Sequence, residues 1–222
     1  MPGAGRTPRD ERRRRLGQNF LVDAAVAQRL VAHARLAPRE LIVEIGPGNG
    51  VLTQVMATHP VEVVCVEADS LWASRLRREA RERGWRHVRV VEADVLRWRL
   101  PTRPFRVLAN LPFGCTTAIL HRLLDDPGLA LRRADLVVQW EVARKRARRP
   151  PTTLLSASWA PWWEFRCGER IAAASFRPRP AVDAGVLSVT RRDPALLPDA
   201  MAKDYERFVR DHWGARRSGP HH

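Results

Sequence analysis

The chain has 222 residues, 45% of them hydrophobic, which is enough for one full hydrophobic core but not for a second large domain. Its 39 lysine and arginine residues outnumber 24 aspartate and glutamate residues, and the formal net charge of +15 favours a polyanionic partner; a basic surface without a specific ligand and a lipid surface are weaker alternatives. No stretch approaches the roughly 20 apolar residues of a membrane helix, and the basic N-terminus lacks the apolar core of a signal peptide, so we expect a cytoplasmic protein without a membrane partner.

Strand-length apolar runs alternate with helical patterns through the first two thirds of the chain. A short helix is predicted over Ala24 to Ala34, with Asp23 in the N-cap position. The segments expected as strands are Leu41 to Gly46, Val61 to Glu67, Val88 to Asp94, Phe105 to Leu111 and Ala134 to Trp140. The segments expected as helices between them are Val51 to Thr58, Ser70 to Arg83 and Thr116 to Leu124. This alternation predicts a parallel sheet covered on both faces.

The last third of the chain has a different pattern. A short helix is expected over Leu154 to Trp159, and two strands, Trp162 to Ile171 and Ala184 to Arg192, flank the proline-rich segment Phe176 to Val182. Two successive strands of this kind fit a closing antiparallel pair. The segment Asp199 to Trp213 carries a rough apolar stripe and predicts one terminal helix.

A glycine-rich turn, Glu44-Ile-Gly46-Pro-Gly48-Asn-Gly50, joins the first long strand to a helix. Glycine lets the backbone turn tightly and approach a ligand closely, although it also simply closes such turns. The spacing is GxGxG rather than the GxGxxG of dinucleotide-binding enzymes, and Glu67 ends the next strand about 20 residues on. At the shared carboxyl edge of the two strands, Glu67 could accept hydrogen bonds from the ribose hydroxyls of a nucleoside cofactor.

Two further strand ends carry polar residues. Asp94 is positioned to accept from an adenine amino group, although a capping or surface aspartate has the same appearance. The fourth strand runs into Asn110-Leu111-Pro112-Phe113, where the amide oxygen and the neighbouring backbone carbonyl can accept from an exocyclic NH2 while the aromatic ring stacks the base. Holding both N–H bonds aligns the nitrogen lone pair toward an electrophilic methyl group without a strong base. A turn ending in a core phenylalanine is the alternative.

Together these motifs resemble the ribosomal RNA adenine N6-methyltransferases, class I enzymes that use S-adenosylmethionine. The resemblance covers about Leu16 to Arg191 and includes the N-terminal motif Gly17 to Leu21 and the late motif Phe176 to Val182. It implies a catalytic set of Asn110, Leu111, Pro112 and Phe113. The cofactor-binding set that it implies is Gln18, Asn19, Leu21, Glu44, Gly46, Gly48, Gly50, Glu67, Ala68, Asp94, Val95 and Asn110.

Within this family, the loop residues Gly114 to Thr117, the tryptophan-rich segments and the DAGVLSV ending resemble the erythromycin-resistance methyltransferases of actinobacteria. That branch implies N6-methylation of a specific adenosine in the peptidyl-transferase region of 23S rRNA, before or during ribosome assembly, with macrolide, lincosamide and streptogramin B resistance. The alternatives are a 16S rRNA dimethyladenosine transferase, which usually has tyrosine in the loop, and a non-catalytic RNA-binding assembly factor.

We therefore expect an α/β, Rossmann-like class I methyltransferase with a seven-stranded, mostly parallel sheet, helices on both faces and a short helical C-terminal tail. The expected divisions are a basic arm over residues 1–15, the methyltransferase domain over 16–192 and a reduced helical segment over 193–222. No metal site is expected, because the three cysteines form no CxxC pair. We also expect a monomer.

The family usually carries a C-terminal domain of several helices, and only one helix is expected here after Arg191. We expect basic segments to contact RNA phosphates in its place, although a run of charges is more often a solvated face. These segments contain Arg12, Arg13, Arg14, Arg15, Arg144, Lys145, Arg146, Arg148 and Arg149.

Overall fold

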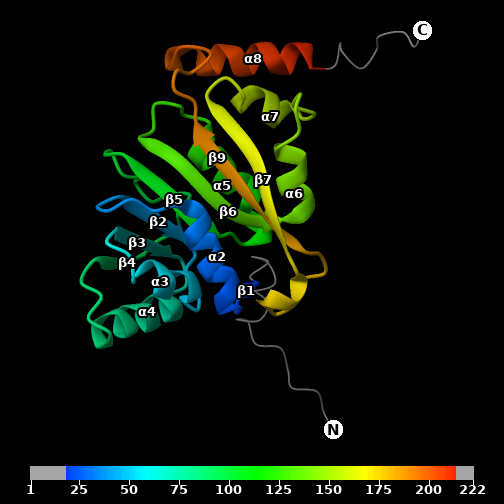
Figure 1. Cartoon of the computed structure of the whole chain (residues 1–222). Helices are drawn as coiled ribbons and strands as arrows, with labels where there is room; N and C mark the ends of the chain where they lie inside the picture. The colour runs from blue at the N-terminus through cyan, green and yellow to red at the C-terminus, as the bar shows by residue number, and fades with distance from the viewer. Residues whose placement is uncertain (1–18, 214–222) are drawn as a thin grey trace.

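The computed structural model describes residues 19–213, which form a sheet with helices on both faces (Figure 1). The first half contains β1 (Phe20–Leu21), α2 (Ala24–Ala34), β2 (Leu41–Ile45), α3 (Val51–Met56), β3 (Glu62–Glu67), α4 (Ser70–Glu82), β4 (Val88–Glu92), β5 (Phe105–Asn110), a 3-10 turn (Phe113–Cys115) and α5 (Thr116–Leu124). The second half contains β6 (Leu131–Gln139), α6 (Trp140–Arg146), α7 (Leu154–Trp159), β7 (Trp163–Ile171), a 3-10 turn (Ala173–Ser175), β8 (Phe176–Arg177), β9 (Ala184–Arg191), a 3-10 turn (Asp199–Met201) and α8 (Ala202–His212).

Seven strands form one sheet in the order β4-β3-β2-β5-β6-β9-β7, and β1 pairs with β8 in a separate antiparallel ribbon. Strands β2 to β6 are parallel, whereas β9 runs antiparallel to both β6 and β7. All five residues of β2 are buried, as expected for a parallel strand covered on both faces. The parallel strands therefore direct their carboxyl ends to one edge of the sheet, where four polar motifs are found.

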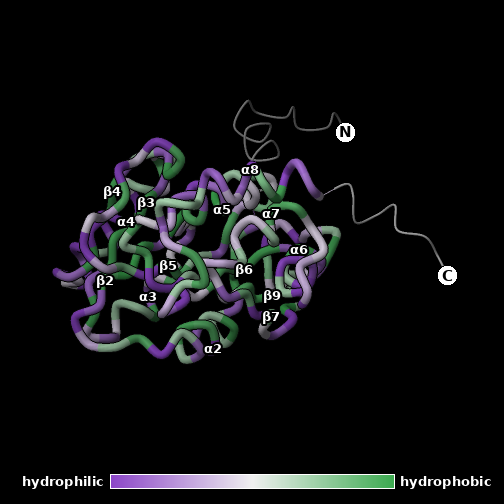
Figure 2. Tube along the Cα trace, turned by 90° about the horizontal axis from the view of Figure 1, so that it is seen from above, coloured by the Kyte–Doolittle hydropathy of each residue, from purple (hydrophilic) through white to green (hydrophobic). Residues whose placement is uncertain are grey.

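Two hydrophobic clusters, one on each face of the sheet, form the core. Helices α2, α3 and α4 contribute apolar side chains to one cluster, and α5, α6 and α7 contribute to the other. In Figure 2 the hydrophobic stretches lie mainly inside and the hydrophilic ones at the periphery. Trp163 and Phe176 are fully buried, so these clusters extend to the later part of the chain. No helix within residues 19–213 is long and apolar enough to cross a membrane.

The predicted fold class and the antiparallel closing pair are confirmed. Asp23 caps α2 as expected, accepting from the backbone N–H groups of Ala25 and Val26 at 3.0 and 3.2 Å. Asp69 caps α4 in the same way, immediately after the end of β3. The caps fix where both helices begin, and α4 thereby starts beside the carboxyl edge of the sheet.

Three elements differ from the sequence prediction. Trp140 begins helix α6, whereas the sequence predicted the end of a strand there. The helix could not be recognised from the sequence, because this short basic segment buries only Ala143 and has no helical apolar stripe. The ribbon of β1 and β8 was not predicted, since strands of two residues carry no periodic signal. The terminal helix begins at Ala202 after a 3-10 turn, three residues later than expected.

Candidate cofactor and target-base site

A cavity of about 710 Å³ lies at the carboxyl ends of β2, β3, β4 and β5. This volume is within the range of small-molecule and cofactor sites. Many of the predicted cofactor residues come together in its wall. These are Asn19, Gly46, Gly48, Glu67, Ala68, Asp94, Val95 and Asn110.

The glycine loop forms the wall nearest to β2. Gly48 has a φ of +53°, and a Cβ atom there would lie only 2.6 Å from the ring of Phe20. Both the left-handed backbone and the close ring therefore require glycine at this position. The Gly48 N–H donates to the Glu67 carboxylate at 3.0 Å, so the loop and the acid at the end of β3 are held together.

Glu67 is only 3% exposed, and its two oxygens accept from the backbone N–H groups of Gly48 and Asp69. Burial raises the pKa of Glu67, while the N–H donors of Asp69 and Gly48 oppose that rise. Each carboxylate oxygen keeps a lone pair for another donor. This geometry suits an acceptor for two neighbouring hydroxyl groups, such as those of a ribose.

Asp94 follows β4 and lines the same cavity. One of its oxygens accepts from the backbone N–H of Leu96 at 2.9 Å, which orders the turn after the strand. The carboxylate is exposed, in contrast to that of Glu67. The capping geometry and a contact with an adenine amine are compatible, because a carboxylate has two oxygens.

Asn110 supplies the most informative atom of the site. Its Nδ2 donates to the backbone carbonyl of Asn19 at 2.8 Å, which fixes the orientation of the amide. Its Oδ1 is buried and has no hydrogen-bond partner within residues 19–213. Leaving a buried acceptor unpaired costs on the order of 1–3 kcal/mol. The cavity therefore contains an oriented oxygen that an N–H donor would satisfy.

Of the residues that follow Asn110, one lies in the core and the others lie at or beside the site. Leu111 is buried in the core, whereas Pro112 lines the cavity. Phe113 lies just beyond the cavity lining, edge-on to Phe176 of β8, with the ring centroids 6.5 Å apart. The late motif is thus brought against the predicted target-base loop.

Strand β1 connects the two halves of the site. The Asn49 side chain donates to the carbonyl of Leu21 at 2.8 Å, so the glycine loop is bound to β1. On its other side, Phe20 packs on Trp72 of α4, with the ring centroids 4.9 Å apart. Asn19, the residue directly before β1, accepts from Asn110, and β1 itself pairs with β8. The cofactor side and the target side are therefore joined through this short segment.

Three residues predicted to bind the cofactor lie outside the lining of this cavity. Leu21 and Gly50 are buried beside it. Glu44 is buried behind the glycine loop, where it accepts from Thr53 Oγ1 at 2.6 Å and from the Cys65 thiol at 3.4 Å. Burial raises the pKa of Glu44 to about 7. Its position supports the loop from the core side. Gln18 lies outside the described residues.

The predicted RNA-binding segments are only partly described, since Arg12 to Arg15 lie outside residues 19–213. In the second segment, Arg146 donates to Thr153 and Ser156 and lies over the Trp159 ring, and burial lowers the pKa of its guanidinium. Arg146 therefore has a structural role that the charge pattern did not indicate.

The other cations of this segment are exposed. Arg144 pairs with Glu141 and Arg149 with Glu164, whereas Lys145 and Arg148 have no ion pair within the described part of the chain. Helix α6 begins at the carboxyl end of β6, and Arg149, beyond its C-terminus, reaches Glu164 at the amino end of β7. Glu164 is in register with Thr190 and Arg133, so Arg149 lies at the edge of the sheet opposite the cavity.

Sequence reasoning missed much of the apolar lining. Ile45, Val66 and Ile119 line the cavity, and they look like ordinary core residues in the sequence. Phe20 could have been found, because it lies within the QNFL motif. Apolar walls generally carry no motif, since any residue of suitable size can form them.

The glycine loop, the buried acid and the orphaned acceptor, all at the carboxyl edge of a mostly parallel sheet with one antiparallel strand, define a class I methyltransferase that uses S-adenosylmethionine. The groups present fit that cofactor: the buried Glu67 carboxylate suits its ribose hydroxyls, and the backbone of Gly46 and Gly48 lines the same cavity.

The particular family follows from comparison with known proteins. Residues 9–219 match the family model "Ribosomal RNA adenine dimethylase", and the chain belongs to this family. It is 37% identical to an rRNA adenine N-6-methyltransferase of Corynebacterium diphtheriae, over 91% of this chain and 78% of that protein. It is 38% identical to the mycinamicin-resistance protein MyrB of Micromonospora griseorubida, over 92% of this chain and 64% of that protein.

A solved structure is also similar along most of the chain. The crystal structure of the 23S rRNA methyltransferase ErmE superposes with a TM-score of 0.79 and 32% identity, covering 89% of this chain and 80% of that one. Across the curated relatives, the chain spans between 54% and 78% of their lengths.

Proposed function

We propose that this chain transfers a methyl group from S-adenosylmethionine to the N6 amine of an adenosine in the peptidyl-transferase region of 23S rRNA, and that it thereby confers macrolide, lincosamide and streptogramin B resistance. The observation that carries the proposal is the buried Asn110 Oδ1, an acceptor without a partner in the described residues, at the wall of the cofactor cavity. An amine supplies the N–H donor that this oxygen lacks.

The residues of the site act by positioning. Asn110 Oδ1 accepts one N–H of the target amine, and the adjacent backbone carbonyl accepts the other, so the nitrogen lone pair points into the cavity. S-adenosylmethionine supplies an electrophilic methyl group on a sulfonium. The methylated nitrogen carries a positive charge and is strongly acidic, so it gives its extra proton to water. Alignment and preorganised dipoles thus supply the rate enhancement, and no strongly basic side chain is needed.

Two relatives favour the large-subunit target. The protein MyrB is named for mycinamicin resistance, and the ErmE structure is titled a 23S rRNA methyltransferase. In this proposal the macrolide binds at the peptidyl-transferase loop, and the methylated amine occupies space that the drug requires.

The test is incubation of the purified chain with labelled S-adenosylmethionine and protein-free 23S or 16S rRNA, followed by primer extension. A stop confined to the peptidyl-transferase loop of 23S rRNA supports the proposal. Labelling of 16S rRNA alone would assign the small-subunit reaction instead. Tight RNA binding without label would assign a binding-only role.

A second measurement tests the consequence. Expression of the chain in a macrolide-susceptible bacterium should raise the inhibitory concentration of erythromycin, and the Asn110→Ala variant at equal expression should not. Equal susceptibility of the two strains would contradict the resistance part of the proposal.

A further inference from the structure

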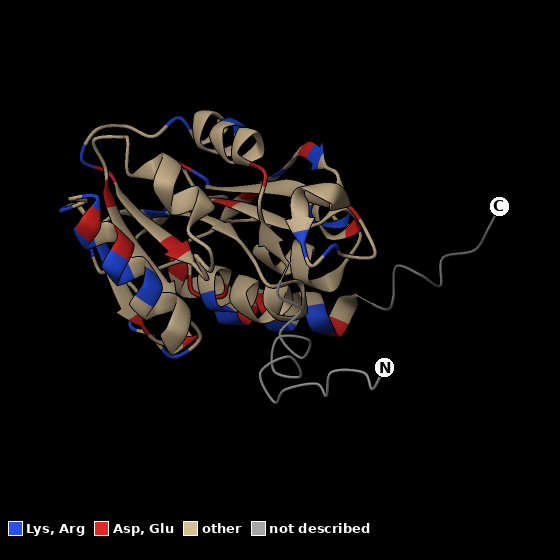
Figure 3. Ribbon diagram, turned by 90° about the horizontal axis from the view of Figure 1, so that it is seen from below, with Lys and Arg blue, Asp and Glu red and all other residues tan. Residues whose placement is uncertain are grey.

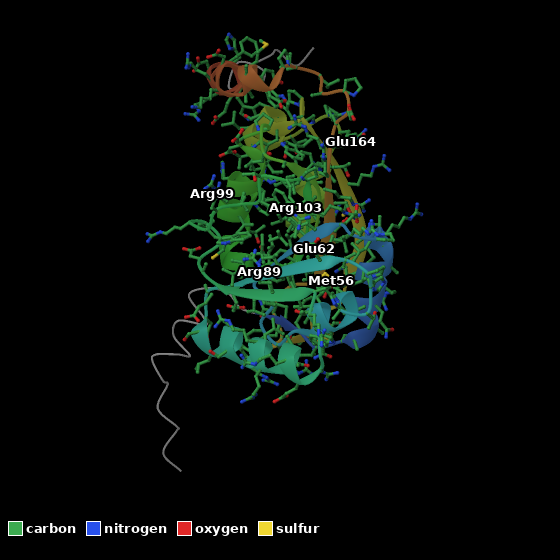
Figure 4. All side chains as sticks on the ribbon, turned by 90° about the vertical axis from the view of Figure 1, so that its left-hand side faces the viewer. Met56, Glu62, Arg89, Arg99, Arg103 and Glu164 are labelled. Carbon is green, nitrogen blue, oxygen red and sulfur yellow. The ribbon has the colours of Figure 1, made fainter. Side chains whose placement is uncertain are left out.

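A second hollow lies away from the cofactor cavity, at the amino ends of β2, β3 and β4. It is a groove of about 770 Å³. Four arginines line it: Arg86, Arg89, Arg99 and Arg103. Figure 4 shows Arg89, Arg99 and Arg103 on one side of the molecule, together with Glu62. We call these four arginines and the hollow between them the arginine groove.

The groove exists because one face of the sheet edge lacks a helix. Helix α4 covers β4 on the opposite face, and the connection between β4 and β5, residues 93–104, contains only turns. Along β4, Val88 and Val90 pack toward the α4 side, so Arg89 projects to the uncovered face. Within that connection, Trp98 is held in place by Arg122 of α5, which donates to its carbonyl at 3.0 Å. The groove therefore has a fixed wall.

The charge of the groove is not balanced locally. Among the described residues that line the groove, Glu62 is the one acidic residue, and it pairs with Arg103. Arg86, Arg89 and Arg99 are exposed and have no ion pair within residues 19–213. By contrast, the helices seen in Figure 3 carry both blue basic and red acidic residues. Arginines gathered without counterions favour an anionic ligand, and the planar guanidinium matches a phosphate bidentately.

The groove is connected to the methyl-transfer site through a shared segment. Residues 93–96 of the β4–β5 connection line the cofactor cavity, and residues 98, 99 and 101–103 of the same connection line the arginine groove. A nucleic-acid strand that crosses this connection would present its phosphates to the groove while a base occupies the target loop. An acidic protein could satisfy the charge but has no reason to lie along this route.

We propose that the arginine groove binds the phosphodiester backbone of the RNA substrate, on the side of the target adenosine that lies over the β4–β5 connection. This proposal rests on the proposed RNA-methylating function. The groove adds an anchoring surface that is separate from α6 and from the basic N-terminal residues.

The test compares the double variant Arg89→Gln/Arg99→Gln with wild type in RNA binding between 50 and 300 mM salt. Loss of two phosphate contacts should reduce the slope of log K against log salt by about 1.4, at about 0.7 per contact with single-stranded RNA. The KM for RNA should rise about tenfold or more, while kcat at saturating RNA and the affinity for S-adenosylmethionine stay within about twofold.

The matched control is Arg78→Gln/Arg207→Gln, which removes the same charge from exposed arginines of α4 and α8. The variant Arg89→Lys/Arg99→Lys retains the charge and should keep a slope near that of wild type. If thermal melting shows that the glutamine variant is folded and it nevertheless has the slope and the KM of the control, the groove proposal is wrong. Because binding is measured apart from transfer, absence of methylation by wild type would overturn the proposed function and leave the groove measurement interpretable.

Discussion

At the residue scale, Asn110 has two ends with different roles. Its Nδ2 is committed to the Asn19 carbonyl, and this bond directs Oδ1 into the cavity without a partner in the described chain. The protein retains an unsatisfied buried acceptor here, although such an atom is costly in a stable core. This arrangement is expected where a substrate provides the missing donor.

The first prediction concerns this amide. Asn110→Ala should reduce kcat by about 100- to 1,000-fold, because it removes a preorganised acceptor of the target amine. The affinity for S-adenosylmethionine, measured by calorimetry, should change by less than about fivefold, since Glu67 and the glycine loop remain. Turnover near that of wild type at saturating RNA would rule out the assigned role.

A second residue-scale prediction concerns Glu44. Burial raises the pKa of this carboxyl from 4.5 to about 7, so the native protein keeps a proton that the unfolded chain has released. Between these pH values the native state binds more protons, and the contribution of Glu44 to stability, fully present below about pH 4.5, is lost as the pH rises toward 8. Glu44→Gln stays neutral and should lack this loss, which is on the order of 3 kcal/mol.

Urea unfolding at pH 5 and pH 8 measures this effect as a difference between wild type and Glu44→Gln. The exposed Glu82→Gln serves as the control and should follow wild type, because its carboxylate is solvated in both states. If Glu44→Gln has the same pH dependence of the unfolding free energy as wild type, then the Glu44 carboxyl is ionised in the native protein. Its hydrogen bonds would then offset the cost of burying the charge.

At the scale of elements, β1 is small but occupies the junction of the site. It contacts the glycine loop through Asn49 and α4 through Phe20 and Trp72. The residue directly before it, Asn19, accepts a hydrogen bond from Asn110 of the target loop. Its pairing with β8 brings Phe176 beside Phe113. Asn19 and the two residues of β1 therefore hold the cofactor side and the target side together, and a small displacement of β1 would affect both.

The prediction for this element is that Asn49→Ala lowers kcat/KM and the affinity for S-adenosylmethionine together, each by about fivefold. This corresponds to about 1 kcal/mol for the hydrogen bond to the Leu21 carbonyl. The control Thr58→Ala removes an exposed side-chain bond to the backbone and should leave both values unchanged. A change in affinity alone, with normal transfer from the bound cofactor, would show that β1 does not connect the two sides.

At the scale of the whole molecule, folding decides where the net charge of +15 is located on the surface. Many arginines pair with nearby acids, and Arg146 is committed to the packing around α7. The excess that remains includes the arginine groove and the exposed cations of α6. The unpaired positive charge is therefore concentrated in the arginine groove, at the amino ends of β2, β3 and β4, and along the segment that contains α6.

For the wild-type chain we expect RNA affinity to fall by about 300-fold between 50 and 200 mM salt, as for a protein with about six phosphate contacts to single-stranded RNA. Filter binding at several salt concentrations measures this, and affinity for S-adenosylmethionine over the same range provides the control. A fall of less than about threefold would mean that the excess charge does not serve RNA binding.

Much of the fold was predictable because the signals were local. Buried parallel strands appear as continuous apolar runs, and Asp23 marks the start of α2, so the order of elements and the strand ends followed from sequence. The roles of Glu67 and the Asn110 loop could be predicted from the sequence, because the chemistry needs particular atoms at particular strand ends. Short elements such as α6 and β1 were not predictable, since their conformations depend on distant partners.

The sequence by itself therefore determined which functional groups are available and at which edge of the sheet they gather. Only the tertiary structure decided how each is used: Glu44 supports the loop from the core, Arg146 packs on Trp159, and Asn110 leaves one oxygen open. It also gathered Arg86 to Arg103 into one groove. The physical reason is that burial, pairing and alignment depend on neighbours far along the chain, and these neighbours exist only in the folded protein.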